Sequence, residues 1–322
     1  MVLERVYICR HGFRLSWETQ LWTSPTGIPR DPPLSAHGVD QAQELAGFLK
    51  AELGVESAAD ALDKGVVVLS SPLYRCVQTA TPTAEALGVP IFVEPGLAEW
   101  YLPVRRGLHP ALADATFLQK FFLLVAASSS SSAAGGAAAW AMLLTPPRTG
   151  ESIRAVHARC ATLVPALVSA LEARGARTVV LFSHAATCIA LSRAFANDLP
   201  PALLAHPSAR PGEPEPLGEW RDEERLGVGA ATCSVSKFVR TAGADTGADA
   251  PGEVWTREWD GRTDFMRRGE ERRWDFTFVE EIAEDGLLDG KEVSATKSDN
   301  YRDLPTAAPK ETVANERKEG RL

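Results

Sequence analysis

The sequence predicts an α/β fold, a three-layer α/β/α sandwich around a mostly parallel sheet. Short buried apolar runs alternate four times with longer segments of helical periodicity, an order typical of parallel strands with helices on both faces of the sheet. A chain of 322 residues, 45% of them hydrophobic, is long enough to bury a large core. Polar residues suited to phosphate chemistry follow three of the apolar runs, at the sheet edge where open α/β proteins bind ligands.

Each expected strand is a short apolar run bounded by charged or turn-forming residues. The expected strands cover residues 6–9, 66–69, 91–93 and 178–182. The expected helices have apolar residues at spacings of three and four, and they cover about 35–50, 71–87, 152–173 and 185–196. Ser35, Ser71 and Ser152 are placed as N-caps, with Pro72 in the first helical position after Ser71.

The remaining segments define the expected domain organisation. We expect one domain over residues 1–290 and a disordered tail over 291–322, which is polar and charged. A Ser/Ala/Gly tract at about 126–139 predicts a flexible insertion, because it has little to bury. From about residue 205 the chain becomes a loop-rich extension. Within it, 230–239 alternates like a strand, and 253–280 is expected to add strand structure.

Charge and cysteine content exclude several classes of protein. The net charge of −8 argues against direct nucleic-acid binding and against attraction to an anionic membrane. Five scattered cysteines without a CxxC pair argue against a zinc site and a disulfide framework, and they fit a reducing compartment. The chain shows neither a signal-peptide pattern nor an apolar run of membrane-spanning length. We therefore expect a cytoplasmic and/or nuclear protein without membrane contact.

Three motifs lie at the carboxyl ends of expected parallel strands. Arg10-His11-Gly12 follows the first strand, Arg75 lies in the first turn of the helix after the second, and His184 follows the fourth. An anion at such a helix start meets free backbone N–H groups, and a neighbouring guanidinium can bind phosphate through two hydrogen bonds. The three strand ends are expected to open onto one crevice, which would supply the local cationic pocket that an anionic substrate needs.

Five segments together resemble the histidine phosphatase superfamily. They are VYICRHGFR, DPPLSAHGVDQAQELA, VLSSPLYRCVQTATPTAEALGVPIFVEPGLAEW, TGESIRAV and VVLFSHAA, in the order that the family shows, and they cover much of residues 5–195. The resemblance implies a phosphoglycerate mutase-like fold in one histidine phosphatase-like domain. The third segment is also similar to the phosphatase domains of suppressor-of-T-cell-receptor-signalling proteins and to the phosphatase-like domain of fungal tau subunits of RNA polymerase III transcription factor IIIC.

The resemblance implies roles for individual residues. His11 would attack phosphorus and become phosphohistidine, while Arg10 and Arg75 would hold the phosphoryl oxygens. His184 would complete the phosphate pocket and stabilise the charge that develops on the transferring group. Glu99 matches the family's acid, which protonates the leaving oxygen and then activates water. A neutral imidazole is a competent nucleophile near pH 7, and arginines supply positive charge without a metal. We therefore expect neither a cofactor nor a metal site.

Departures from other branches favour hydrolysis. Arg14, in RHGxR, matches an extra phosphate-facing arginine of phosphatase-type members. The mutase branch has RHGES, whereas Phe13 and Arg14 stand here. In the acid-phosphatase and phytase branch the second histidine is usually followed by aspartate, whereas Ala185 stands here.

Other polar and aromatic residues remain open or receive structural roles. Glu151 is expected near the helix that Ser152 caps. Four aromatic residues are compatible with two interpretations: they line a substrate mouth that suits phosphotyrosine, or equally they form the core of loops. These residues are Trp17, Trp22, Trp100 and Tyr101. Four histidines match no catalytic motif and are assigned to structure or surface: His37, His109, His157 and His206.

Two functions are carried forward. The first is a metal-independent phosphomonoester hydrolase that acts through a phosphohistidine intermediate on a small phosphoester or a phosphotyrosine. The alternative is a phosphatase-fold binding subunit of a transcription complex, similar to the transcription factor IIIC tau subunit, with weak or incidental catalysis. The extension after residue 205 offers a surface for a protein partner, and a homodimer is also open. A mutase-like isomerase ranks last.

Overall fold

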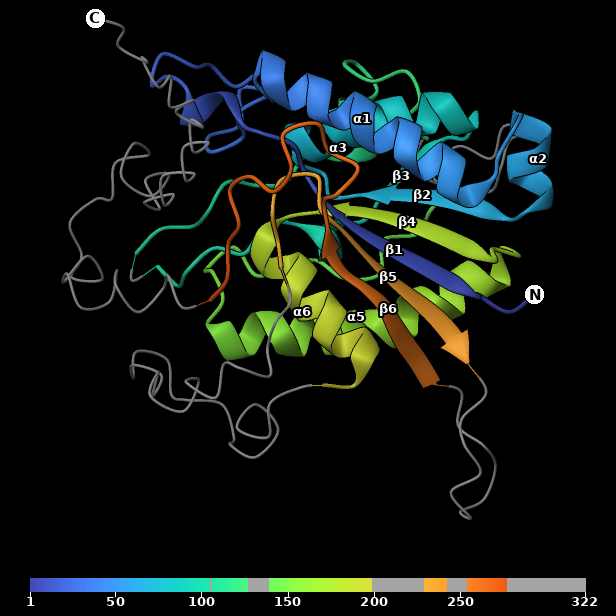
Figure 1. Cartoon of the computed structure of the whole chain (residues 1–322). Coiled ribbons are helices and arrows are strands. Elements are labelled where there is room, and N and C mark those ends of the chain that lie inside the picture. Colours follow the sequence, from blue (N-terminus) through green and yellow to red (C-terminus); the bar gives the residue numbers. More distant parts are fainter. Residues whose placement is uncertain (105, 127–138, 199–228, 242–253, 277–322) are drawn as a thin grey trace, which may run out of the picture.

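A computed structural model of the protein describes residues 1–104, 106–126, 139–198, 229–241 and 254–276. Within these residues a central β-sheet lies between two layers of helices (Figure 1). The three-layer α/β/α arrangement expected from the sequence is confirmed.

The sheet has six strands in the order β3-β2-β4-β1-β5-β6. Four strands run parallel to one another: β1 (Arg5–Arg10), β2 (Val66–Ser70), β3 (Ile91–Val93) and β4 (Thr178–Ser183). Strand β5 (Val235–Thr241) is antiparallel to β1, and β6 (Val254–Arg262) is antiparallel to β5. The carboxyl ends of β2, β4 and β1 therefore lie side by side in the middle of the sheet.

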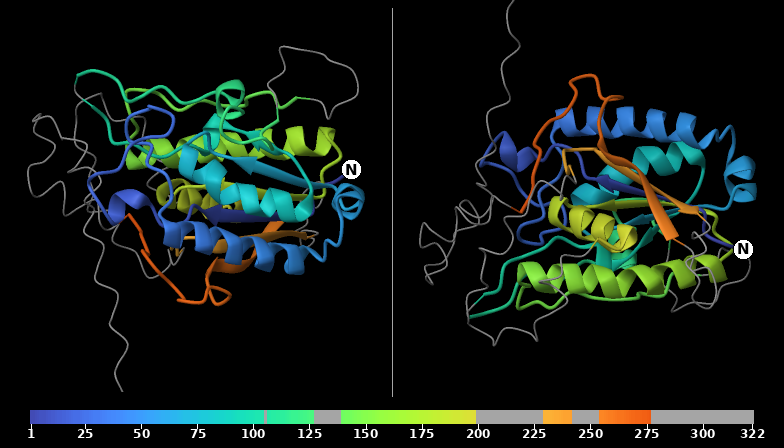
Figure 2. Two further views of the ribbon diagram at one scale, coloured as in Figure 1. Left: turned by 90° about the horizontal axis from the view of Figure 1, so that it is seen from above. Right: turned by 60° about the horizontal axis from the view of Figure 1, so that its bottom comes forward.

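Two long helices cover each face of the sheet (Figures 1 and 2). On one face these are α1 (Ala36–Leu53) and α3 (Tyr74–Leu87), and on the other they are α5 (Ile153–Ala173) and α6 (Ala185–Ala196). Shorter elements are α2 (Ala58–Asp63), α4 (Ala115–Leu118) and the 3-10 helices η1 (Leu15–Trp17) and η2 (Pro95–Leu97).

Alternating side chains on β1 explain why both faces are covered. Val6 and Ile8 belong to the buried cluster that α5 and α6 complete. Tyr7 and Cys9 belong to the second buried cluster, on the side of α1 and α3. Successive residues of a strand point to opposite faces, so an apolar run without alternation needs a helix layer on each side.

Two of the three expected serine caps are present. Ser35 and Ser152 each accept a hydrogen bond from the backbone N–H three residues further on. The expected cap at Ser71 is wrong, since α3 starts three residues later and Pro72 lies before it. The Ser71 hydroxyl instead lies 2.8 Å from Nε2 of His184.

The region after residue 205 is described only in part. The strand expected at 230–239 is observed as β5, which begins later, at Val235. The strand structure expected within 253–280 is β6, and residues 263–276 continue as a turn-rich segment. All but the two end residues of the insertion expected at about 126–139, the first part of the extension (205–228) and the tail at 291–322 lie outside the described residues.

Two findings bear on the expected environment. Among the described residues, no helix combines the length and apolar character that a bilayer crossing requires. All five cysteines are buried as free thiols.

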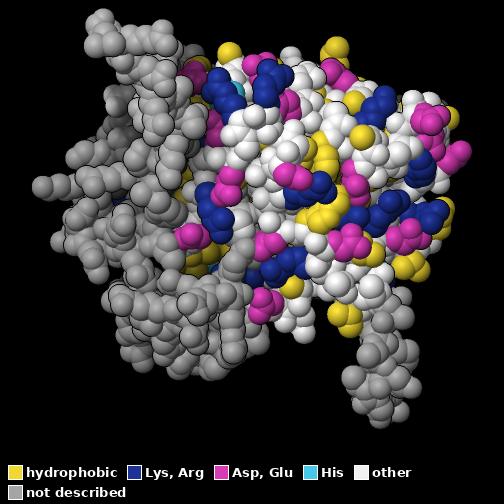
Figure 3. Space-filling view, in the orientation of Figure 1, with side chains coloured by type: hydrophobic (Ala, Val, Ile, Leu, Met, Phe, Trp, Pro, Cys, Tyr) yellow, Lys and Arg dark blue, Asp and Glu magenta, His cyan; other side chains and the backbone are white. Residues whose placement is uncertain are grey.

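Figure 3 shows acidic and basic side chains interspersed over the face that carries β5 and β6. On β5, Lys237 lies 2.9 Å from Glu52 and 2.8 Å from Glu258.

Candidate active site

The structure brings together the residues that follow β1, β2 and β4. His11 comes directly after β1, Arg75 lies in the first turn of α3, and His184 is the N-cap residue of α6. The rings of His11 and His184 are 5.3 Å apart between centroids. All three side chains are almost fully buried, with exposed fractions of 2%, 1% and 0%. The convergence expected at the strand ends is therefore present in the described residues.

His11 is held as a neutral imidazole with one nitrogen available. Its Nδ1 lies 2.8 Å from the carbonyl oxygen of Gly12. A carbonyl can only accept, so Nδ1 carries the proton and Nε2 has the free lone pair. Burial lowers the pKa of His11 well below its usual value, and the charges of Arg75 and Arg10 lower it further. The ring is thus unprotonated near neutral pH, as a nucleophile must be.

Three arginines surround His11. Arg10 is buried and donates to the carbonyl oxygens of Ala230 and Arg272. Arg14 stacks over Trp17, 4.3 Å from the ring centroid, and its charge contributes to the lowered pKa of His11. The charges of Arg75, Arg10 and Arg14 all act on His11, and positive charge gathered in this way favours an anionic ligand.

Glu99 lies opposite, within reach of both Arg75 and His184. Its Oε2 is 3.1 Å from Nη2 of Arg75 and 3.3 Å from Nδ1 of His184. Burial raises the pKa of Glu99, but the stronger combined effect of His184, Arg75 and Arg14 holds it well below its ordinary value. The carboxyl group is therefore ionised in this state of the protein.

His184 is contacted at both ring nitrogens. Burial and Arg75 lower its pKa to about 4, although Glu99 acts in the opposite direction. Nδ1 also lies 3.1 Å from Nη2 of Arg75, so it can accept from Arg75 or donate to Glu99. The Ser71 hydroxyl at Nε2 can donate or accept, and it therefore suits either tautomer.

Three side chains of the same centre are potential metal ligands. Within the described part of the chain, ligand atoms of His11, Glu99 and His184 all lie within 4.8 Å of one another. Two neutral imidazoles and a carboxylate are suitable ligands for zinc. However, Arg75 contacts both Glu99 and His184, and a guanidinium at the ligand atoms opposes a cation. The residues fit an anion better than a metal.

Several supporting residues were not identified from the sequence. Asp31 is 2% exposed, accepts from the backbone N–H of Tyr74, and lies 3.6 Å from Nη1 of Arg75. Thr79 accepts from the N–H of Gly12 and donates to the carbonyl of Arg75. These contacts couple the His11 loop to α3. Asp31 and Thr79 both lie in the segments that carried the family resemblance, but only distant contacts reveal their roles.

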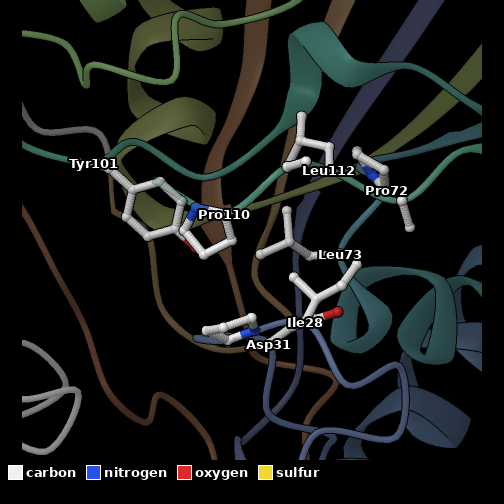
Figure 4. Close-up of a pocket in the computed structure, with 10 residues that line it drawn as sticks. Ile28, Asp31, Pro72, Leu73, Tyr101, Pro110 and Leu112 are labelled. Carbon is white, nitrogen blue, oxygen red and sulfur yellow. The ribbon is translucent and has the colours of Figure 1, made fainter. Parts of the chain in front are cut away.

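A pocket beside Asp31 is too small for a substrate. Its volume is about 10 Å³, room for roughly one water molecule. Figure 4 shows Ile28, Leu73 and Pro110 around it, with Tyr101 at one side. This pocket therefore gives no support for a substrate site beside Asp31.

The four aromatic residues selected from the sequence lie in different environments, some near the site and others in the core. Trp17 lies at the site, 6.1 Å from His11 between ring centroids, and Tyr101 stacks with His109 at 4.8 Å. Trp100 is core: it is 6% exposed and donates through Nε1 to the carbonyl of Glu151. Trp22 is half-buried.

The other candidates have structural partners. Glu151 pairs with Arg159 at 2.8 Å rather than serving the helix start. His37 lies 2.6 Å from Glu271, and His157 is fully buried beside Arg193. His206 lies outside the described residues.

Residues just before β5 and just after β6 complete the site. The carbonyls of Ala230 and Arg272 accept from Arg10, and the N–H of Cys233 donates to the carbonyl of His11 at 3.3 Å. Sequence reasoning found no role for this region except as a partner surface. Its contribution is visible only in the fold, because each contact spans more than two hundred residues.

An α/β sandwich with a buried histidine, a second histidine and arginines at the strand ends is the arrangement expected of the histidine phosphatase fold. Comparison with known families agrees: the model of the histidine phosphatase superfamily (branch 1) matches residues 6–211. The chain belongs to this superfamily.

Individual relatives differ in how much of the chain they resemble. Transcription factor tau 55 kDa subunit of Saccharomyces cerevisiae is 29% identical, across 97% of this chain and 68% of its own length. Ubiquitin-associated and SH3 domain-containing protein A of Mus musculus is 34% identical, across 30% of this chain and 19% of its own length. Among solved structures, the ecdysone phosphate phosphatase of Bombix mori has a TM-score of 0.49 at 20% identity, covering 73% of this chain and 88% of that one.

Proposed function

We propose that this protein is a histidine phosphatase-fold subunit of a transcription complex, and that it retains a site for phosphoryl groups. The observation that supports assembly is the similarity to a transcription factor subunit along 97% of the chain. Similarity to the mouse protein is confined to 30% of the chain. The region after the family match, which includes β5 and β6, is thus shared with the transcription factor subunit. The proposal implies a nuclear location and protein partners.

Purification from the native cells tests the assembly. A tagged chain should elute far above its own mass of 34.7 kDa and should carry other subunits in a fixed stoichiometric ratio. Mass spectrometry should identify those proteins as subunits of a transcription factor. Elution only at the mass of a monomer or a homodimer would contradict the proposal.

A second proposal is supported by the geometry of the site. We propose that the chain hydrolyses phosphomonoesters, either small phosphoesters or phosphotyrosine. Arg10, Arg75 and His184 surround the position next to His11 where a phosphoryl group would lie. The convergence of His11, Glu99 and His184 within 4.8 Å is the observation that supports it. No step requires a metal, since the arginines supply the positive charge.

The first half of the reaction transfers the phosphoryl group to His11. The Nε2 lone pair attacks phosphorus, the bond to the ester oxygen breaks, and the electron pair stays with that oxygen. Glu99 protonates this oxygen. The incoming phosphate dianion competes for Arg75 and His184 and places negative charge beside Glu99. Both effects raise the pKa of Glu99, so that its carboxyl can take up the proton that it later donates.

The second half releases phosphate. Glu99, now a carboxylate again, accepts a proton from water as the water oxygen attacks phosphorus. The P–N bond breaks and its electron pair returns to Nε2 of His11. Inorganic phosphate leaves, and the neutral imidazole is restored. The hydrogen bond from Nδ1 to Gly12 keeps the same tautomer throughout.

Phosphate release from 4-nitrophenyl phosphate tests the chemistry. Wild type and His11→Ala are compared over a pH series without added metal, with melting temperature as the control for folding. Activity in wild type that His11→Ala abolishes would support hydrolysis through His11. Equal phosphate release by the variant would contradict the mechanism, and an inactive wild type would leave only the assembly role.

A further inference from the structure

The backbone that leads into Glu99 is fixed by side chains from α5 and α6, two helices that cover the same face of the sheet (Figures 1 and 2). Arg159, on α5, donates through Nη1 to the carbonyl oxygen of Gly96 at 2.6 Å, and both of its Nη atoms lie 3.4 Å from the carbonyl oxygen of Ala98. Thr187, on α6, donates its hydroxyl to the same Ala98 carbonyl at 2.8 Å. The peptide unit directly before Glu99 is therefore held by two helices.

The backbone that follows Glu99 is fixed by Glu151. The indole Nε1 of Trp100 donates to the carbonyl oxygen of Glu151 at 2.7 Å, and the N–H of Glu151 donates to the carbonyl oxygen of Tyr101 at 2.8 Å. The backbone N–H of Trp100 in turn donates to Oε1 of Glu99 at 3.1 Å. The position of Trp100 therefore helps to set the direction of the Glu99 carboxyl group.

One buried ion pair joins these two flanks of Glu99. The carboxylate of Glu151 lies 2.8 Å from Nε of Arg159, and the two side chains are only 4% and 3% exposed. A guanidinium is planar and carries its donors in a fixed fork. Nε of Arg159 can therefore serve the carboxylate while Nη1 and Nη2 serve the backbone carbonyls. The residues before and after Glu99 are thereby tied to the same pair of side chains.

We infer that Arg159, Glu151 and Thr187 are positioning residues for Glu99. The inference rests on the proposed hydrolysis, in which Glu99 is the acid that protonates the leaving oxygen. Each of the three residues acts through the backbone of residues 96–101. Together they hold the Glu99 carboxyl group at the place where the leaving oxygen must meet it.

Glu99 needs this support because its side-chain partners change during the proposed reaction. In the structure its Oε2 lies 3.1 Å from Arg75 and 3.3 Å from His184. A bound phosphate dianion would compete for both partners, so these contacts would not hold the carboxyl group during transfer. Proton transfer requires the acid within about 2.6–3.2 Å of the accepting oxygen. A displacement of about 1 Å can slow a reaction roughly a hundredfold, so contacts that the phosphate does not disturb are needed.

Thr187→Val is the mildest test, because valine keeps the shape of threonine and removes only the hydroxyl. Phosphoryl transfer is measured in single turnovers with 4-nitrophenyl phosphate and with phenyl phosphate, whose leaving oxygen needs a proton. The ratio of the first rate to the second should rise about tenfold, the effect expected from one lost hydrogen bond. Partial unfolding lowers both rates by the same factor, so a merely destabilised protein would keep the wild-type ratio.

Arg159→Gln should raise the ratio further, because it removes the contacts to both Gly96 and Ala98. Arg159→Lys keeps the charge beside Glu151 but cannot serve a carboxylate and two carbonyls together, so its ratio should be intermediate. Thr187→Val combined with Glu99→Gln should have the ratio of Glu99→Gln alone, because the acid through which the hydroxyl acts is then absent.

Thr81→Val and Arg193→Gln are the matched controls. The hydroxyl of Thr81 donates within α3, to the carbonyl oxygen of Val77 at 2.7 Å. Arg193 is a buried arginine on α6 whose Nη1 lies 3.1 Å from Nε2 of His157. Both variants should keep the wild-type ratio, even where Arg193→Gln lowers the melting temperature.

The outcomes separate this inference from the proposed hydrolysis. A wild-type ratio in both Thr187→Val and Arg159→Gln would overturn the positioning role while hydrolysis stands. If Arg159→Gln does not fold, Thr187→Val decides the question, since it changes no charge. A further rise of the ratio in the double variant, beyond that of Glu99→Gln, would show that Thr187 acts apart from the acid. Failure of the wild type to transfer from either ester would contradict the hydrolysis and the positioning role with it.

Discussion

The carboxylate of Glu99 contacts the guanidinium of Arg75, with 3.1 Å between Oε2 and Nη2. Arg75 is thus already paired with an anion of the protein's own. In the proposed mechanism a phosphate dianion would compete with Glu99 for Arg75, and this exchange would couple substrate binding to protonation of Glu99. Ligands that cannot displace Glu99 should bind weakly.

Glu99→Gln tests this coupling. Glutamine keeps the shape but cannot donate a catalytic proton. The effect of the substitution should depend on the leaving group. The 4-nitrophenolate ion leaves without being protonated, whereas the phenolate oxygen needs a proton to leave. In single-turnover measurements, transfer from phenyl phosphate should slow about a hundredfold or more. Transfer from 4-nitrophenyl phosphate should remain fast, giving a burst of nitrophenol. Equal slowing of both esters would contradict the acid role.

Ser71→Ala tests whether the Ser71 hydroxyl positions His184. The hydroxyl is buried and lies 2.8 Å from Nε2, so its removal should take away a hydrogen bond that holds the orientation of the ring. We expect kcat to fall about tenfold with little change in KM, the cost of one buried hydrogen bond. The ¹⁵N chemical shift of Nε2 of His184 should report the loss of this hydrogen bond. Ser70→Ala is the control, because that hydroxyl donates to the carbonyl of Ser71 and not to His184. Unchanged kcat and unchanged shifts in Ser71→Ala would rule out positioning.

A chelator should leave phosphate release unchanged. Although His11, Glu99 and His184 could act as metal ligands, the neighbouring arginines favour an anion at that point. Incubation with EDTA followed by assay in metal-free buffer is the measurement. Inorganic phosphate, in contrast, should inhibit competitively. Loss of activity in EDTA that added zinc restores would show that the three residues hold a metal.

His157 should make the protein less stable in acid. Burial and Arg193 lower its pKa to about 3, whereas an unfolded histidine titrates near 6.5. The stabilising contribution is therefore complete above about pH 6.5 and is lost as the pH falls toward 3. Urea unfolding at pH 7 and at about pH 4.5 measures this loss, and His157→Gln should reduce it by roughly 2 kcal/mol. A residual loss should remain, since His11 and His184 also have lowered pKa values. The same acid loss in His157→Gln and wild type would contradict the assignment.

Gly38→Ala should disrupt the site through packing. A Cβ at Gly38 would lie 2.1 Å from the carbonyl oxygen of Phe13, so either α1 or the His11 loop must move. We expect a loss of about 3 kcal/mol or more in unfolding free energy, together with lower activity. Gly47, in the same helix, is the control, because a Cβ there meets nothing within 4 Å. Gly47→Ala should stabilise by about 0.5–1 kcal/mol. Melting curves of both variants decide the matter, and similar effects in the two would refute the steric argument.

Local patterns predicted most of the fold. The four parallel strands and four long helices follow from apolar runs and helical spacing, and Ser35 and Ser152 cap their helices as expected. These signals act over a few residues and need no tertiary information. The local pattern gave a wrong prediction at Ser71, which was expected to cap α3. Its hydroxyl instead contacts His184, a residue 113 positions away in the sequence.

The sequence by itself determined the class of fold. Through motifs at the strand ends it also indicated His11, Arg75 and His184 as candidate site residues. Only the tertiary structure decided that Glu99 pairs with Arg75 and is ionised, and that Arg272 reaches the site. The physical reason is the range of the interactions. Strand and helix formation depend on neighbours along the chain, whereas the charge state of a buried group and the contacts of a distant loop depend on what the folded chain places around them.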